Sequence, residues 1–101
     1  MWAQLITMQV KPGKQDDVRA IAEHLQAIEQ PDSGLLQSIA MTDQSDPTRV
    51  YFLVVFESEE KARARENDPR RADGLQELQA KMEGLVDGHR EFVNLDVTFS
   101  S

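Results

Sequence analysis

The sequence predicts a single α+β domain in which helices cover one face of a four-stranded antiparallel sheet. Three observations support this fold class: four segments with the apolar pattern of strands, helical spacing between the first two and the last two of them, and Pro or Gly at their borders. A chain of 101 residues can bury a two-layer core without a disulfide or a metal. Residues 1–101 are therefore expected to form one domain.

The first half of the chain reads as strand, helix and strand. Residues 2–10 are predicted to form the first strand, which a Pro-Gly pair closes. Residues 14–30 have apolar residues at helical spacing and acidic residues near the helix start. Residues 31–34 end this helix, and residues 35–42 follow as a second strand. Its alternation places four side chains on one side of the strand: Leu35, Gln37, Ile39 and Met41.

The second half adds a strand, two helices and a last strand. A hairpin loop leads to residues 49–56, so the second and third strands should pair antiparallel. Ser58 is the expected N-cap of the next helix, and Asp68 is expected to cap a further helix that starts with Pro69. That helix should end at Gly88, before a fourth strand over residues 90–99. It is expected to bury Ala72, Leu75, Leu78, Met82, Leu85 and Val86. The order β-α-β-β-α-α-β is ferredoxin-like, with the second helix interrupted.

The third strand is apolar on both faces, which is unusual for a sheet covered by helices on one side only. Its alternation gives one face Val50, Phe52, Val54 and Phe56, and the other face Tyr51, Leu53 and Val55. The face away from the helices would be mostly polar in a monomer. We therefore expect a symmetric homodimer that packs sheet against sheet.

Composition excludes several classes of partner and chemistry. The net charge of −7 argues against nucleic acid and anionic membrane surfaces as partners. The chain has no cysteine, which excludes thiolate catalysis and fits a cytoplasmic location. No basic segment followed by an apolar one opens the sequence, so no signal peptide is expected. No apolar run approaches the roughly 20 residues of a membrane span.

Five short motifs, in a fixed order, carry a resemblance to a known family. They are Val10 to Lys14 before the first helix, Pro31 to Gly34 before the second strand, Asp46-Pro47 in the hairpin, Phe56 to Glu60 after the third strand, and Asp68-Pro69. Over nearly its whole length the chain resembles the antibiotic biosynthesis monooxygenase (ABM) domain. The resemblance implies a dimeric α+β barrel that holds a small hydrophobic or aromatic ligand between the sheet and the helices of one subunit.

The chain departs from the family at its most reactive positions. The family often has a Trp after the third strand and His residues in the following helix and after the Pro. Those positions hold Phe56, Arg65 and Arg70 here, and Val54 replaces an acidic residue that is often found late in the third strand. Arg cannot act as a base, but Arg65 and Arg70 can bind an anionic oxygen or a carboxylate. Without the usual His, haem ligation is disfavoured, and we expect no cofactor.

Three polar residues are candidates for catalysis if the pocket is catalytic. Asn94 and Asp96 alternate with apolar residues on the fourth strand, and either line the pocket or face solvent or the dimer rim. Asp96 is the best carboxylate base in the first case. His24 lies at the edge of the apolar stripe of the first helix, as either a general base or a boundary residue.

Aromatic residues offer stacking surfaces for a ligand. Phe56 is expected at the pocket, and Tyr51 either stacks on an aromatic ligand or fills the dimer core. The two histidines, His24 and His89, lack the spacing of metal ligands, so no metal site is expected.

Two functions from different classes remain open on this basis. The first is a cofactor-independent monooxygenase, or a related isomerase, that acts on an aromatic or quinol-type small molecule. The second is a non-catalytic dimeric module that binds a small molecule after losing the usual Trp and His residues.

Overall fold

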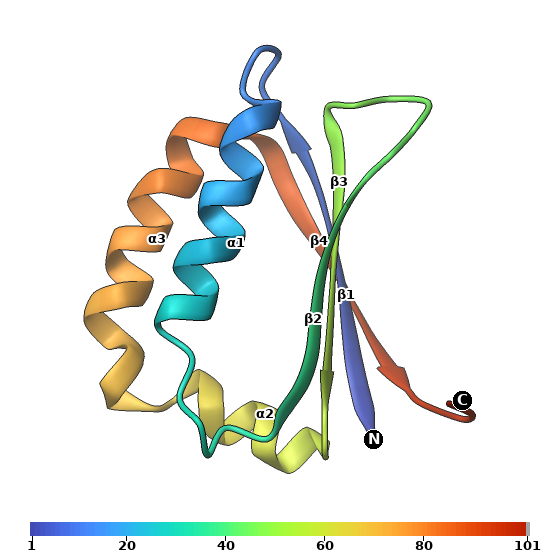
Figure 1. Ribbon diagram of the computed structural model, residues 1–101, viewed down its shortest axis with the longest axis vertical. Coiled ribbons are helices and arrows are strands. Elements are labelled where there is room, and N and C mark those ends of the chain that lie inside the picture. Colours follow the sequence, from blue (N-terminus) through green and yellow to red (C-terminus); the bar gives the residue numbers. More distant parts are fainter. Residues whose placement is uncertain (101) are drawn as a thin grey trace.

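The computed structural model describes residues 1–100 as an antiparallel sheet with two long helices on one face (Figure 1). The strands lie in the order β2-β3-β1-β4, and the predicted ferredoxin-like α+β fold is confirmed. The strands are β1 (Trp2–Val10), β2 (Leu35–Thr42), β3 (Arg49–Phe56) and β4 (Val86–Asp96). The helices are α1 (Val18–Ala27), α2 (Glu59–Glu66) and α3 (Ala72–Leu85).

The central pair of strands has the predicted alternation of faces. β1 pairs with β3 in a continuous register in which Ile6 lies opposite Phe52 and Leu5 opposite Leu53. Paired residues share a face of the sheet. Even-numbered residues of both strands therefore point to the helices, and odd-numbered residues point away from them.

The predicted alternation of β2 is wrong at its first residue. The register shifts between Leu35 and Gln37, so that Leu35 lies opposite Phe56 and Gln37 lies opposite Val55. Such a β-bulge adds one residue to one strand and reverses the side-chain faces beyond it. Leu35 consequently shares the helix side of the sheet with Phe56, whereas Gln37, Ile39 and Met41 lie on the other side.

The fourth strand begins earlier and ends earlier than predicted. α3 ends at Leu85, and β4 runs from Val86 to Asp96, so Gly88 lies within the strand instead of ending the helix. The pairing with β1 shifts between Thr7 and Gln9, and Gly88 has a positive φ of 79° close to this shift. A positive φ is favourable only for glycine, so the same residue type that commonly ends helices here allows an irregular strand.

The helix caps follow the prediction, but the helices are shorter. The Ser58 side chain accepts a hydrogen bond from the Lys61 N–H, and the Asp68 carboxylate accepts one from the Arg70 N–H. Pro69 starts a single 3₁₀ turn that leads into α3. The first helix was expected over residues 14–30 and instead consists of a 3₁₀ turn, Gln15–Asp17, followed by α1.

The buried core is split into two clusters at opposite ends of the sheet. The larger one lies between α1, α3 and the sheet and consists of Met8, Val10, Val18, Ile21, Val50, Phe52, Leu78, Met82 and Leu85. The smaller one, Trp2, Phe56 and Ala62, lies where α2 covers the sheet. Among the residues that α3 was expected to bury, Ala72 is exposed because it starts the helix on its outer side.

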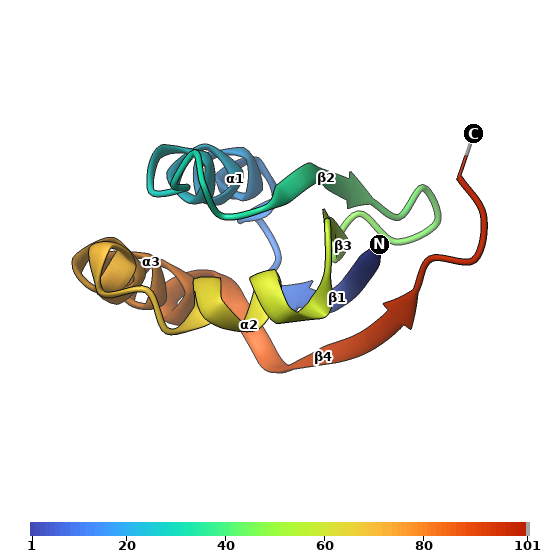
Figure 2. The same cartoon turned by 90° about the horizontal axis from the view of Figure 1, so that it is seen from below.

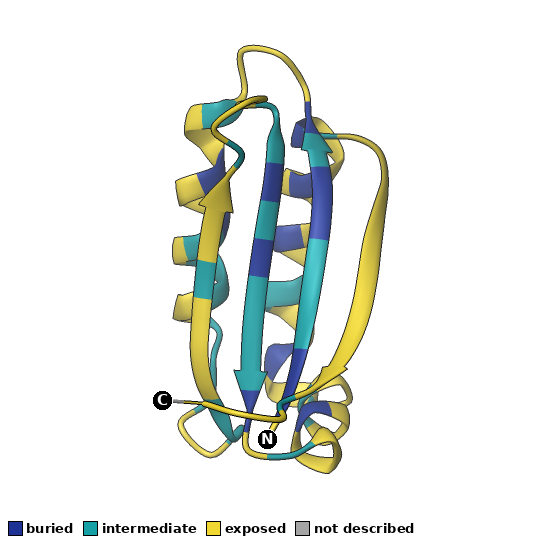
Figure 3. Ribbon diagram, turned by 90° about the vertical axis from the view of Figure 1, so that its right-hand side faces the viewer, coloured by how far each residue is buried: buried dark blue, intermediate teal, exposed yellow. Residues whose placement is uncertain are grey.

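The face of the sheet away from the helices is apolar and partly open to solvent. Viewed from below, α1 and α3 lie on one side of the sheet only (Figure 2). On the opposite side the central strands are buried or intermediate, and the edge strands are exposed (Figure 3). Large apolar side chains remain accessible on this face at Met41, Val93 and Leu95.

Candidate functional site

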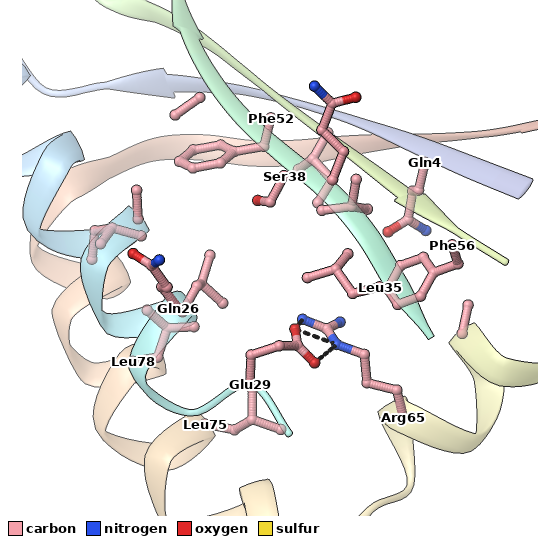
Figure 4. A pocket seen from close by; sticks show the side chains of 18 of the residues that line it. Gln4, Gln26, Glu29, Leu35, Ser38, Phe52, Phe56, Arg65, Leu75 and Leu78 are labelled. Atoms are coloured by element: carbon pink, nitrogen blue, oxygen red, sulfur yellow. Dashed lines mark hydrogen bonds and ion pairs between the residues drawn. The ribbon is translucent and has the colours of Figure 1, made fainter. Parts of the chain in front are cut away.

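A cavity of about 780 Å³ lies between the helices and the sheet, between the two core clusters (Figure 4). Every secondary-structure layer of the domain contributes to its wall. The sheet contributes Gln4, Ile6, Ser38, Phe52 and Val54, α1 contributes Ala22, Leu25 and Gln26, and α3 contributes Leu75 and Leu78. A volume in this range suits a small ligand with several rings.

One end of the cavity has an aromatic wall. Trp2 and Phe56 lie with ring centroids 6.1 Å apart and planes tilted by 47°. This tilted arrangement is typical of a favourable aromatic pair. Trp2 is the single tryptophan of the chain, so its fluorescence reports on this wall.

The same end holds an ion pair that crosses the cavity. The Arg65 guanidinium, at the end of α2, donates hydrogen bonds to both carboxylate oxygens of Glu29, at 2.6 to 2.9 Å (Figure 4). Their side chains are only 14% and 15% exposed. The Arg65 guanidinium also lies over the Phe56 ring, 5.1 Å from its centroid. Ala62 of α2 packs in a buried cluster with Trp2 and Phe56. This contact holds the short polar helix against the sheet, with Arg65 on its inward side.

The pKa of Glu29 is lowered by this arrangement. Burial raises it, but the hydrogen bonds from Arg65 and Ser33, together with the positive charges of Arg65 and Arg71, have the larger combined effect. Glu29 is therefore a carboxylate at neutral pH. A carboxylate held in this form is a weak base.

A second arginine, Arg71, lines the cavity beside this pair. It is only 3% exposed, and its Nη1 donates a hydrogen bond of 3.3 Å to the Arg65 backbone carbonyl. Its Nε has no hydrogen-bond partner among residues 1–100. Burial, and then the charge of Arg65, lower the pKa of Arg71.

Two of the four predicted ligand-binding residues line the cavity. Phe56 and Arg65 lie in its wall. Tyr51 lies on the other face of the sheet, where its hydroxyl donates to Asp43 (3.1 Å) and accepts from Arg49 (3.0 Å). Arg70 lies outside the cavity and forms ion pairs with Asp68 and Asp32, at 2.6 and 2.8 Å.

The three predicted catalytic residues lie outside the cavity wall. Asn94 is on the helix side of β4, opposite Gln4, and accepts a 3.0 Å hydrogen bond from the Gln4 side chain. Asp96 lies two residues further on the same side and is exposed. Of the two, Asn94 contacts a residue of the cavity wall, because its partner Gln4 lines the cavity.

His24 bridges two helices instead of facing the cavity. Its Nε2 lies 2.8 Å from the Gly74 carbonyl of α3, and its Nδ1 lies 3.1 Å from the Lys81 ammonium. A carbonyl oxygen only accepts, so Nε2 carries the proton and Nδ1 accepts from Lys81. The His24 ring thus ties α1 to α3. None of the described residues that line the cavity is a histidine.

Glu29 and Arg71 are charged residues beside Arg65 in the cavity wall that sequence reasoning missed. Glu29 follows Leu25 by four residues, so helical spacing extended beyond Leu25 would have placed it on the inward side. Nothing in the sequence distinguishes Arg71 from its exposed neighbour Arg70, because the 3₁₀ turn at Pro69 decides which of them is buried.

Two further findings concern metals and membranes. Within residues 1–100, no group of three or more His, Cys, Asp or Glu side chains is arranged to hold a metal ion. No helix in this part of the chain is long and apolar enough to cross a membrane.

The fold and the cavity define an α+β domain with a pocket between sheet and helices that has many apolar residues in its wall and the Arg65–Glu29 pair at one end. Residues 1–77 match the family model described as antibiotic biosynthesis monooxygenase (ABM). The chain belongs to this family. The resemblance predicted from the five motifs is confirmed.

Solved structures share the whole fold at low sequence identity. A candidate antibiotic biosynthesis monooxygenase from Nitrosomonas europaea superposes with a TM-score of 0.75 and 17% identity, over 98% of this chain and 100% of the other. A candidate antibiotic biosynthesis monooxygenase from Bordetella bronchiseptica gives a TM-score of 0.76 and 13% identity, over 97% of both chains. These similarities show the fold. The curated proteins gave no match.

Proposed function

We propose that this protein is a cofactor-independent monooxygenase that oxidises an aromatic or quinol-type small molecule in the cavity between sheet and helices. The observation that carries the proposal is the cavity itself, about 780 Å³ in a chain of the ABM family, with an aromatic wall next to a guanidinium. Apolar surface there accepts fused rings, and Arg65 offers N–H donors to an oxygen that gains negative charge.

The reaction would use the electrons of the substrate itself. Deprotonation of an anthrone-type methylene gives a carbanion whose negative charge is shared with the carbonyl oxygen of the ring system. This anion transfers one electron to O₂, and the resulting radical and superoxide combine into a peroxide at that carbon. Loss of water then leaves a carbonyl, so the methylene and O₂ become a ketone and H₂O, with all four electrons supplied by the substrate.

Arg65 is the residue that we assign to charge stabilisation. An oxygen of the substrate placed near its guanidinium would be favoured more strongly as it becomes an oxyanion, which lowers the barrier to deprotonation. Phe56, directly below that guanidinium, would stack on the ring system. At the β4 edge, Asn94 positions Gln4, which lines the cavity. Asp96 is exposed outside the cavity wall, so it would receive the proton through water that leads out of the cavity.

The proposal includes a homodimer formed through the outer face of the sheet. Apolar side chains on that face, among them Met41, Val93 and Leu95, are exposed in the single chain. A second copy would cover them. We also place the protein in the cytoplasm, because a chain without cysteine forms no disulfides and therefore fits a reducing compartment.

Oxygen uptake tests the activity. The purified protein, with no added cofactor, is assayed in an oxygen electrode across a panel of anthrones and hydroquinones. We expect uptake above autoxidation with at least one compound, and its loss in Arg65→Met but not in Lys14→Met, which removes an exposed charge outside the cavity wall. Uptake that is equal in the wild type and Arg65→Met would overturn the assignment of Arg65.

A non-catalytic binding module is the second candidate, and one observation favours it. The wall of the cavity has no histidine among the described residues, and its most buried carboxylate, Glu29, is held by Arg65 with a lowered pKa. A site of this kind binds well but accepts protons poorly. Quenching of Trp2 fluorescence by a compound that gives no oxygen uptake would support the binding module over the enzyme.

A further inference from the structure

The charged end of the cavity carries two guanidinium groups but only one buried carboxylate. Glu29 accepts hydrogen bonds from the Nε and Nη2 donors of Arg65. Arg71 lines the same cavity and is buried, and its Nε has no partner among residues 1–100. Glu66 also reaches this end, but it is exposed and paired with Arg63 at 3.1 Å. The charges of Glu29, Asp68 and Glu66 act on Arg71, but within residues 1–100 none of these carboxylates forms an ion pair with it, and its Nε donor is left unused.

A buried guanidinium with an unused donor is unfavourable unless something pairs with it. Leaving water costs a charged group several kcal/mol, which only a close partner of opposite charge offsets. The lowered pKa of Arg71, caused by burial and by Arg65, is consistent with this cost. An anion that entered the cavity would relieve it, and the Nε–H of Arg71 would gain an acceptor.

Glu29 shows which anion fits this end of the cavity. It is a carboxylate, and it is held by two adjacent N–H groups of one guanidinium, Nε and Nη2, as planar carboxylates commonly are. The free Nε of Arg71 is one half of the same kind of donor edge. Apolar side chains, including Phe52, Phe56 and Leu75, line the space beyond it.

We propose that the natural ligand of this cavity is a ring-containing apolar molecule with one carboxylate, which binds at Arg71 beside the Arg65–Glu29 pair. This inference rests on the proposed function in one respect: it takes the cavity as the ligand site. It adds the charge of the ligand and the residue that selects for it. Arg71 recognises the carboxylate, and the aromatic wall holds the ring body.

Two probes of the same shape and different charge test the proposal. 2-Naphthoate and 2-naphthamide are titrated separately into the wild-type protein at pH 7 by isothermal titration calorimetry. The two differ in charge and share the ring system. We expect 2-naphthoate to bind about tenfold or more tightly, since a desolvated guanidinium–carboxylate contact exceeds a neutral hydrogen bond by at least that factor.

Three variants assign the preference to residues. Arg71→Met should lower the affinity for 2-naphthoate at least fivefold and leave that for 2-naphthamide within twofold. Glu29→Gln should raise the affinity for 2-naphthoate, because it removes the anion that competes for the guanidinium groups. Lys14→Met, which removes an exposed charge outside the cavity wall, should change neither affinity by more than twofold.

Each outcome supports or overturns the proposal. Equal affinities of the wild type for the two probes overturn it, as does an unchanged 2-naphthoate affinity in Arg71→Met. If Arg71→Met weakens both probes alike, the Glu29→Gln result decides: a rise for 2-naphthoate alone supports the carboxylate site, and no rise overturns it. Binding is measured without oxygen consumption, so a protein that prefers the carboxylate but oxidises nothing would contradict the monooxygenase and not this inference.

Discussion

At the scale of single residues, the pair of Arg65 and Glu29 couples stability to pH. The pKa of Glu29 is lowered in the folded protein, so the pair stabilises the fold fully above the unfolded pKa of about 4.5 and loses this effect as the pH falls through the lower folded pKa. We expect Glu29→Gln to lower the free energy of unfolding by about 2 kcal/mol at pH 7. At pH 3 the difference from the wild type should be smaller, as measured by urea unfolding.

A surface pair serves as the control for this prediction. Glu23 lies four residues from Arg19 in α1, with side chains that are 65% and 88% exposed. Such a pair contributes about 0.5 kcal/mol or less. Glu23→Gln should therefore have little effect at either pH. A loss in Glu29→Gln that is the same at pH 7 and pH 3 would show that the charge of Glu29 does not contribute to stability.

Arg71 is expected to stabilise the free protein little or not at all. Replacement of a buried charge that lacks a full set of partners by an apolar side chain of similar length is often neutral or stabilising. We expect Arg71→Met to unfold in urea at the wild-type midpoint or above it. A loss of more than about 2 kcal/mol would show that Arg71 has a mainly structural role through its bond to the Arg65 carbonyl.

The sequence predicted part of the cavity at this scale. Phe56 and Arg65 were predicted because they stand where the resembled family often has a Trp and a His. Tyr51 lies on the face away from the cavity, because it alternates with Phe52 along β3. Arg71 was not readable, because its burial depends on a 3₁₀ turn and on packing against Arg65, neither of which leaves a periodic signal.

At the scale of elements, α3 contains two glycines in contrasting surroundings. A Cβ at Gly74 would lie 2.3 Å from Cγ2 of Ile28, which follows α1, whereas a Cβ at Gly84 would meet no atom within 4 Å. We expect Gly84→Ala to stabilise the protein by about 0.5–1 kcal/mol, because alanine is the better helix former. Gly74→Ala should destabilise it, because α1 and α3 must separate. Thermal unfolding of both variants measures the difference.

The close approach at Gly74 also explains the position of His24. Its ring reaches the Gly74 carbonyl because no side chain separates the two helices there. If Gly74→Ala were as stable as Gly84→Ala, Ile28 would have to move away from α3 without loss of stability, which would contradict the close packing of α1 and α3 at this point.

Elements were predicted better than their ends. Side-chain caps at Ser58 and Asp68 act through local hydrogen bonds, so short motifs reveal them. The start of β4 was missed, since Gly88 has the positive φ of a helix-ending glycine but lies in a strand irregularity next to β1. That conformation depends on pairing with a strand some 80 residues away, which no local pattern contains.

At the scale of the whole molecule, the helices and the sheet contribute different surfaces. The helix side of the sheet encloses the cavity, and on the opposite side the edge strands are exposed in the single chain (Figure 3), with apolar side chains at Met41, Val93 and Leu95. Because β1 and β3 present residues to both sides, a change on the outer face can be made without entering the cavity. The proposed dimer can thus be tested separately from the ligand site.

Val93 is the position at which we test the proposed dimer. It lies opposite Leu5 on the outer face of β4 and is 47% exposed. In a dimer formed through this face, Val93→Asp would bury a carboxylate without a partner, and we expect it to shift the protein to monomers in sedimentation velocity. Ala80→Asp, on the exposed surface of α3, should leave the sedimentation coefficient of the wild type unchanged. A wild type that sediments as a monomer at 100 μM would contradict the dimer, and the apolar outer face would then need another occupant.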